Sequence, residues 1–516
     1  MEAKKEWEKE MQEEKQALEQ KKEAEKQQTV YEKSMDENYF YFLMISICFG
    51  FCYVFGTYNI ESGLGLFAAT VGEIACCLAM VKKWKMEIKK DILFYIVMIL
   101  ALSVMMLWTN QIFLHFFQKR AILILFLMML LHQLYTYQSW RLKDELYYTL
   151  TLVCNGIVSL FQPAEQFLKQ LQKEKVEIKK GIYVLLGIAI AVPLVLFIGI
   201  MLSVADVVFK NMIVNLFGNL FLPKNMILIL FLFLFGFWVF YCFMAGLSKM
   251  NIKTAPKQIQ KAEPVIAITF TSVLLAIYIL FCVIQIVYLF AGGENNLPQG
   301  YTYSSYARRG FFELLVVSVI NFLMVVICNI NFRKSKWLDG ILIGISVCNM
   351  ILIASSAYRM LLYIGAYHLT TLRVFVLWFL AALTVSMVGV IYSIWKKEYG
   401  LFRYVFIVAL VFFIAISGIK PHALVVRYNL SHMQWYSMDD LTYMMNLSYD
   451  AAPELAKIDT DKIIVESEHS GEEIMREYFE NVKIYCEKRR GRAYHIGAKK
   501  AEKAAEQYLN EIVPYV

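Results

Sequence analysis

Two arginines and a glutamate stand at the start of an apolar segment, where charged side chains are costly to place. Arg308 and Arg309 end a polar stretch, and Glu313 follows them by five and four residues inside the segment 311–330. In a continuous helix this spacing brings the carboxylate within reach of both guanidinium groups. Charges at the mouth of a membrane helix are usually paired or functional. This stretch is therefore the first candidate polar site.

Three further charged residues are predicted at the same membrane face as this stretch. The loop charges described below assign that face to the outside. Asp206 follows the apolar segment 181–204, and Arg359 and Arg373 border two later apolar segments. Arg359 and Arg373 are separated by 373 − 359 = 14 residues, close to four helical turns, so a continuous helix places them on one face. The candidate cluster then comprises Asp206, Arg308, Arg309, Glu313, Arg359 and Arg373.

Two interpretations of this cluster stay open. Ion pairs near the headgroups fix helix packing, or clustered arginines bind an anionic substrate or a lipid headgroup. In either case we expect Arg308 and Arg309 to contact Asp206 or Glu313. Arg359 or Arg373 is expected on the same surface.

Glu73 is the acid placed deepest in an apolar segment, 64–81, directly after Gly72. An ionised carboxylate in hydrocarbon is expensive, so such a residue is a functional candidate. The alternative is a protonated glutamate that bonds to a neighbouring amide such as Gln285 or Asn321. The sequence leaves both interpretations open.

No other pattern of reactive side chains points to catalysis or to a metal. The histidines form no HExxH motif and no close pair in the sequence, and there is no nucleophile elbow or phosphate loop. Nine of the ten cysteines lie in or beside apolar segments, and the tenth is Cys486. Cysteine there behaves as a small hydrophobe. We expect no enzymatic activity, no cofactor and no metal site.

Composition places the chain among multi-spanning helical membrane proteins. Apolar residues make up 59% of the 516 residues, with 37 Phe and 32 Tyr, and only 18% are charged. The apolar runs are about twenty residues long, the length that a helix needs to cross a bilayer. The net charge of +8 comes from the loops between these runs, so it does not indicate nucleic-acid binding.

The expected architecture is all-α and polytopic, with about eleven transmembrane helices. The predicted spans are 39–59, 64–81, 92–108, 121–137, 181–204, 226–247, 265–290, 311–330, 338–357, 374–395 and 403–419. The segment 146–161 is apolar but short, with basic flanks, so we expect it to lie in the membrane interface.

Two polar segments flank this transmembrane domain, 39–419. Residues 1–38 are rich in Glu, Lys and Gln and predict a charged, solvated helix. Residues 420–516 show helical patterns at 439–447, 472–489 and 498–512, with turn signals at Ala452-Pro453 and Gly471. We expect a small helical domain there.

Charge in the loops predicts the orientation. Lys82-Lys83-Trp84-Lys85 and Lys89-Lys90 form the strongest basic loop, which is typical of the cytoplasmic side. This assignment places the N-terminus in the cytoplasm. With eleven crossings, residues 420–516 lie outside, and one span more or fewer reverses that side.

Five stretches in order resemble a family of uncharacterised bacterial membrane proteins, the domain of unknown function 4173, which is close to number 4153. They are 203–209, 306–313, Arg359–Tyr363 with Leu369–Arg373, 426–429 and 447–455. Where the family pattern has Asn-Pro before the Arg-Tyr-Asn segment, this chain has Lys420-Pro421-His422. The resemblance implies a multi-pass protein of the bacterial plasma membrane, with no established activity.

Two classes of function remain. The first is a non-enzymatic membrane component, a sensor or an assembly partner that engages other membrane proteins. The alternative is a transporter or lipid-handling protein with an anionic lipid or metabolite at the outer arginines. Pro193 is the one proline well inside a span, and transporters with broken helices usually have more interruptions, which favours the first class.

Overall fold

The computed structural model describes residues 29–134, 142–173, 224–250, 261–286, 311–396, 399–464 and 470–512, with a few residues between 195 and 212. These residues form helices, and β-structure within them is limited to two isolated bridges. Ten of their helices are long and apolar enough to cross a membrane. The all-α polytopic fold is confirmed.

The chain divides into two compact units. Unit 1 comprises residues 1–61, 65–100 and 121–256, and unit 2 comprises residues 62–64, 101–120 and 257–516. The division passes through two long helices, α5 (Lys90–Trp108) and α6 (Ile112–Leu134).

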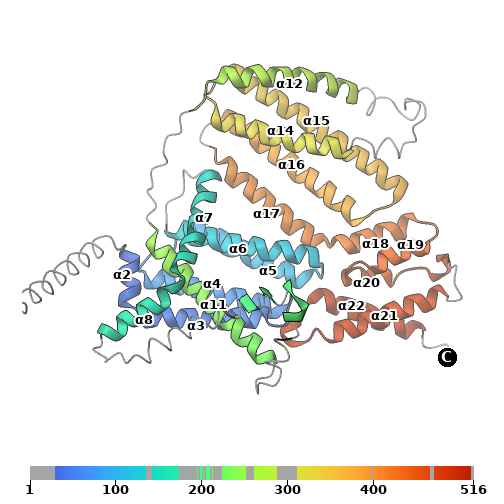
Figure 1. The fold of residues 1–516 in the computed structure, drawn as a ribbon. Helices are drawn as coiled ribbons and strands as arrows, with labels where there is room; N and C mark the ends of the chain where they lie inside the picture. The colour runs from blue at the N-terminus through green and yellow to red at the C-terminus, as the bar shows by residue number, and fades with distance from the viewer. Residues whose placement is uncertain are drawn as a thin grey trace, which may run out of the picture. The chain divides into compact units, whose positions relative to one another are not determined.

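Unit 1 is built around one central helix. Its other helices are α2 (Val30–Glu37), α3 (Tyr39–Thr57), α4 (Leu64–Lys83), α7 (Leu142–Val158) and α8 (Gln162–Lys173), and the centre is α11 (Lys224–Lys249). α11 packs along both α3 and α7 (Figure 1). A Cβ added at Gly246 of α11 would lie 2.7 Å from the Gly156 nitrogen of α7, so the absence of a side chain allows the two backbones to approach.

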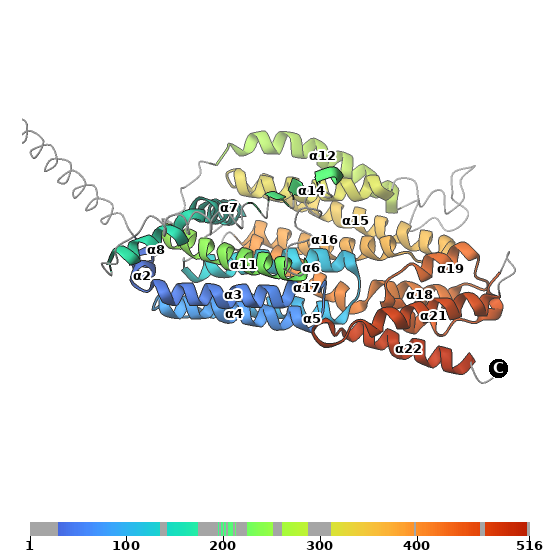
Figure 2. The same ribbon diagram turned by 60° about the horizontal axis from the view of Figure 1, so that its bottom comes forward.

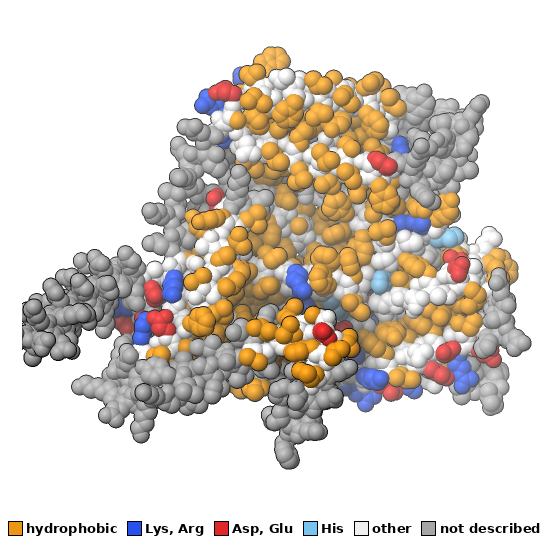
Figure 3. Space-filling model, in the orientation of Figure 1, with side chains coloured by type: hydrophobic (Ala, Val, Ile, Leu, Met, Phe, Trp, Pro, Cys, Tyr) orange, Lys and Arg blue, Asp and Glu red, His pale blue; other side chains and the backbone are white. Residues whose placement is uncertain are grey.

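Among the described residues of unit 2, five long apolar helices pack together. They are α12 (Pro264–Gln285), α14 (Phe311–Asn331), α15 (Lys336–Tyr367), α16 (Thr371–Trp395) and α17 (Leu401–Ile419) (Figures 1 and 2). α12 and α14 both pack on α15, α15 packs on α16, and α16 packs on α17. On α14 the small and polar residues Ser318 and Asn321 face inward, whereas Phe312, Val316 and Ile320 are more than half exposed. Hydrophobic side chains cover α12 and α14 on the face shown in Figure 3. Polar residues inside and apolar residues outside are the reverse of the pattern in a soluble protein. This arrangement suits helices surrounded by lipid.

The C-terminal residues of unit 2 form a separate helical layer beyond the ends of α16 and α17 (Figures 1 and 2). It comprises α18 (Pro421–His432), α19 (Met438–Met445), α20 (Ala452–Leu455), α21 (Gly471–Glu487), α22 (Ile496–Ile512), η4 (Tyr449–Ala451), η5 (Thr460–Lys462) and η6 (Gly491–Ala493). Leu441, Leu455, Phe479 and Ala501 are fully buried in its own core. α21 begins with a capping box at Ser470.

Several boundaries differ from the sequence prediction. The predicted span 121–137 is wrong at its start, because α6 begins at Ile112. Lys119 and Arg120 therefore belong to the helix, and the Arg120 guanidinium lies 4.5 Å from the centre of the Phe116 ring. Long basic side chains can remain inside a membrane helix by extending along its apolar surface.

Other differences concern the last spans and the polar segments. α15 continues ten residues beyond the predicted end at 357, and Ala452-Pro453 starts helix α20 instead of marking a turn. Proline is favoured at the first positions of a helix because its missing N–H is not needed there. The predicted span 181–204, apart from a few residues, and the charged segment 1–28 lie outside the described residues.

Candidate functional site

The predicted arginine cluster is described only in part. Arg308 and Arg309 lie outside the described residues. Glu313 is exposed on the first turn of α14. The exposed Asp206 carboxylate accepts the backbone N–H groups of Val208 at 2.6 Å and Phe209 at 3.1 Å. The expected contacts of the two arginines stay a prediction.

Arg359 and Arg373 do not share a continuous helix, so that premise is wrong. α15 ends at Tyr367, because His368 adopts a left-handed backbone conformation with φ of 61°. Nη1 of Arg373 donates to the carbonyls of Tyr367, at 2.7 Å, and His368. Arg373 thus caps the end of α15, where carbonyls lack helical partners.

Arg359 is buried inside the helix layer and does not lie at its outer edge. Its Nη2 donates to Oε1 of Gln285 on α12 at 3.2 Å, and Ser355 Oγ donates to the same oxygen at 2.7 Å. The sequence prediction placed Arg359 beyond the span because it ended that span at 357. The extra turns of α15 carry the arginine inside.

Glu73 lies half-buried on α4. The two amides considered as its partners are used within unit 2. Gln285 bonds to α15 as described above, and Asn321 Nδ2 donates to Asn349 Oδ1 at 3.3 Å. Hydrogen bonds of this kind hold membrane helices together.

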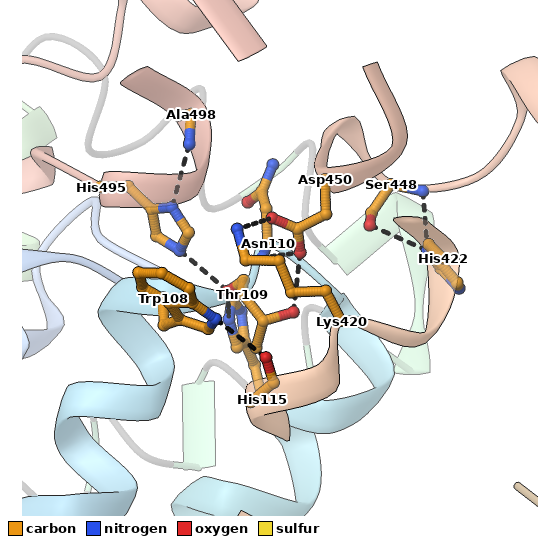
Figure 4. Close-up of polar contacts among 11 residues, drawn as sticks. Trp108, Thr109, Asn110, His115, Lys420, His422, Ser448, Asp450, His495 and Ala498 are labelled. Atoms are coloured by element: carbon orange, nitrogen blue, oxygen red, sulfur yellow. Dashed lines mark hydrogen bonds and ion pairs between the residues drawn. The ribbon is translucent and has the colours of Figure 1, made fainter. Parts of the chain in front are cut away.

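A polar cluster of unit 2 surrounds the Asp450 carboxylate of η4 (Figure 4). Its Oδ2 accepts the Thr109 hydroxyl at 2.7 Å and the Asn110 backbone N–H at 2.5 Å. Its Oδ1 pairs with Lys420 Nζ at 3.1 Å, and the two side chains are only 1% and 13% exposed. We name this set the Asp450 cluster: Thr109, Asn110, His115, Lys420, His422, Ser448, Asp450 and His495.

Two histidines from distant parts of the chain meet at one carbonyl. Nε2 of His115 and Nε2 of His495 donate to the Thr109 carbonyl oxygen at 2.6 and 2.8 Å, and their ring centres are 6.1 Å apart. Nδ1 of His495 accepts the Ala498 N–H at the start of α22 (Figure 4). The sequence does not reveal this pair, because 380 residues separate the two histidines (495 − 115 = 380).

The third histidine of the cluster joins α18 to the segment before η4. Nδ1 of His422 accepts the Ser448 backbone N–H at 2.8 Å and lies 2.8 Å from the Ser448 hydroxyl. Its Nε2 lies 2.9 Å from Gln111 Nε2. Because Nδ1 is an acceptor, Nε2 carries the proton of the neutral ring and requires the Gln111 amide to turn its oxygen toward it.

Burial keeps these rings neutral. The pKa of His422 and the pKa of His495 are each lowered to about 4 by burial, although the Asp450 carboxylate acts in the opposite direction. At neutral pH the Asp450–Lys420 pair is therefore the charged centre of the cluster.

The backbone conformation and the close contacts nearby accommodate the Asp450–Lys420 pair. Lys420 has φ of 56° and forms the turn between α17 and α18. Its Nζ also lies 4.8 Å from the Trp108 ring centre, and the Trp108 indole donates to the Gly418 carbonyl at 3.1 Å. At Gly497 an added Cβ would come within 2.5 Å of Asp450 Oδ1, so only glycine allows this approach.

The arrangement joins several elements of unit 2. Ser448 and His422 have the distance of a nucleophile and its base, but the backbone N–H of Ser448 shares the same ring nitrogen. Within the described ranges, no group of three His, Cys, Asp or Glu could hold a metal ion. The cluster fastens η4, α18 and α22 to the loop between α5 and α6.

Half of the cluster residues stand in stretches that the sequence comparison with the family already singles out. Ser448 and Asp450 belong to the fifth resembling stretch, and Lys420 and His422 form the departure from the family pattern. Thr109, Asn110, His115 and His495 carried no signal. A polar Thr-Asn-Gln turn between two apolar segments was the clue that could have pointed to them.

A comparison with known protein families matches the part of the chain that holds most of this cluster. A family model described as "Domain of unknown function (DUF4153)" matches residues 96–458. These residues include Thr109, Lys420 and Asp450 but not His495. No curated protein and no solved structure matches the chain. The match is to number 4153 and not to 4173, the family placed first from the sequence. The chain belongs to the DUF4153 family of domains of unknown function.

Proposed function

We propose that this protein is a non-enzymatic component of the bacterial plasma membrane whose C-terminal helices present a fixed surface to other proteins. The observation that carries the proposal is the Asp450 cluster. Its buried ion pair and histidine bonds hold residues 421–512 against the helix ends of unit 2. A rigidly held domain binds partners without first losing the conformational freedom of a flexible tail.

The domain also exposes apolar side chains that its own core does not use. Trp435 is 60% exposed and Ile464 is 52% exposed, and they flank the bridge between Tyr436 and Ile463. Exposed tryptophan is enriched at the centres of protein interfaces. Trp435 is therefore the position that we expect a partner protein to cover.

Charge at the helix ends supports an external position for this domain. Arg333 and Lys334 lie between α14 and α15, Lys336 is the first residue of α15, and Lys396 follows α16. These ends are opposite to the ends that meet the Asp450 cluster. Basic loops favour the cytoplasm, so the C-terminal domain faces outside and the N-terminus lies inside.

Photo-crosslinking tests the partner-binding role. A photoreactive amino acid replaces Trp435 in intact cells, and the matched control replaces exposed Ile484 on α21. We expect one specific adduct at position 435 that is lost in Lys420→Met, while the control position gives none. Equal adducts at both positions, or an adduct unchanged by Lys420→Met, contradict the proposal.

A second candidate function is transport or lipid handling, and buried polar residues of α15 favour it. Arg359 bonds to Gln285, and Ser346, Asn349, Ser355 and Ser356 are also fully buried along this helix. A buried guanidinium suits an anionic group. An anionic phospholipid should then raise the Tm of the wild type more than a zwitterionic one. Arg359→Gln should remove that difference, and an unchanged difference would exclude this site.

A further inference from the structure

Three buried polar side chains form a chain across α5, α6 and α7 in unit 1, apart from the Asp450 cluster. Tyr95 Oη lies 2.5 Å from His132 Nδ1, and His132 Nε2 lies 2.8 Å from Glu145 Oε1. The three residues are 6%, 2% and 5% exposed. Phenol, imidazole and carboxylate are thus aligned at hydrogen-bond distance.

The donors and acceptors of this chain follow from its chemistry. With Glu145 ionised, Nε2–H of His132 must donate to the carboxylate, which leaves Nδ1 as an acceptor. The Tyr95 hydroxyl then donates to Nδ1. Each group passes a proton in the same direction, from Tyr95 toward Glu145.

One oxygen of Glu145 supplies a second observation. Oε2 is buried and has no hydrogen-bond partner among the described residues. An anionic oxygen left unpaired in a low-dielectric site is unfavourable. Protonation of the carboxyl group removes the charge. A metal ion fits less well, because within the described residues no third His, Cys, Asp or Glu completes a ligand set.

Charged residues and backbone groups surround this chain of side chains. Lys89 Nζ donates to the His132 carbonyl at 3.0 Å, and its backbone N–H donates to Gln133 Oε1 at 3.2 Å. Gln133 Nε2 donates to the Glu87 carbonyl, and Asp144 precedes Glu145 on α7. Asp91 also lies close enough to interact with the Lys89 ammonium group.

We propose that Tyr95, His132 and Glu145 form a proton-transfer chain that takes up one proton on the Glu145 carboxyl group. A proton arrives at Tyr95 Oη, the phenol proton moves to His132 Nδ1, and the Nε2 proton moves to Glu145 Oε1. The bonds formed and broken balance, with one proton gained and His132 left as its other tautomer. Chains of His and acidic residues at membrane depth serve this purpose in pumps and transporters.

Infrared spectroscopy of the full-length protein in detergent tests this proposal. We expect one component of the carboxylic-acid C=O band that grows as the pH falls and that appears in the difference spectrum between the wild type and Glu145→Gln. Glu73→Gln is the matched control, because it removes another acid of unit 1 and should retain the band. Size-exclusion chromatography confirms that each variant is folded.

The relay itself is tested by the rate of proton uptake after a pH jump. Tyr95→Phe and His132→Gln should each slow the appearance of the Glu145 band by roughly tenfold or more, because a positioned proton donor is lost. A purely structural trio would change stability but not this rate in the folded protein. A difference spectrum between the wild type and Glu145→Gln that contains no such component, or wild-type rates in both relay variants, overturns the proposal.

Discussion

At the scale of single residues, Asp450 illustrates how a buried charge is tolerated. Its two oxygens accept a hydroxyl, a backbone N–H and an ammonium group, so each oxygen has a hydrogen-bond partner. The net gain from such a pair is small, but removal of one partner leaves an isolated charge. The cluster is therefore sensitive to single changes and tolerant of paired ones.

Lys420→Met should lower the free energy of unfolding by about 3–5 kcal/mol, because Asp450 then stays buried without its cation. The double variant Lys420→Met with Asp450→Asn should recover part of the loss. Chemical unfolding in detergent measures both. Lys462→Met is the control, since Lys462 pairs with a half-exposed Asp459 and should change stability by about 1 kcal/mol at most. Equal losses for Lys420 and Lys462 would contradict this account.

The two cluster histidines outside the spans predict a pH dependence. Their pKa values are about 4 in the folded protein and near 6.5 when exposed, so the unfolded chain binds more protons between these values. Stability is full above pH 6.5 and falls as the pH drops toward 4, by on the order of 3 kcal/mol for each buried ring. Unfolding of His495→Gln measured across this range should show a shallower slope than the wild type. An identical slope would exclude His495.

At the scale of elements, close backbone approach determines where α22 begins. Gly497 lies on the first turn of this helix, and an added Cβ would be 2.5 Å from Asp450 Oδ1 and 3.0 Å from the Trp108 carbonyl oxygen. The helix start and the loop after α5 are thus fitted to each other without room for a methyl group.

Gly497→Ala should therefore destabilise the protein by about 1–3 kcal/mol, the usual range for overpacking. Gly418→Ala on α17 is the matched control, because nothing lies within 4 Å of an added Cβ there. Alanine is the better helix former, so the control should be neutral or stabilising by up to about 1 kcal/mol. Thermal unfolding of both variants checks the pair. A stabilising Gly497→Ala would show that α22 can shift away from η4.

At the scale of the whole molecule, consecutive membrane helices place their connecting loops alternately on the two faces of the membrane. In unit 2 the loops that bond to the C-terminal helices follow α5, α15 and α17. The basic loop at Arg333, Lys334 and Lys336 lies at the other end of α15. Consecutive crossings of a bilayer require this separation.

A cysteine at Ser470, an exposed N-cap, should react with a membrane-impermeant maleimide on intact cells. A cysteine at exposed Lys336 should react only after permeabilisation. The wild type gives the background from native cysteines. Labelling of Ser470→Cys only after permeabilisation would place the C-terminal domain in the cytoplasm and remove the external orientation.

The sequence by itself determined the fold class, because a bilayer accepts only long apolar helices or closed barrels, and composition distinguishes these directly. Apolar runs of about twenty residues also located ten of the spans, and helical patterns located α19, α21 and α22. The ends of the helices were less accessible, since Arg120 lies inside α6 near its start and Arg359 inside α15 near its end. A basic side chain marks a membrane boundary only if it cannot reach along the helix surface or bond inside.

Only the tertiary structure decided which polar residues meet. Thr109, Lys420, Asp450 and His495 come from four segments whose spacing in sequence has no period, so no local pattern relates them. The same holds for Tyr95, His132 and Glu145, which stand on three helices. Periodicity reports which face of one helix is apolar. The partner of a buried polar group depends on how several helices pack, and that is a property of the folded chain.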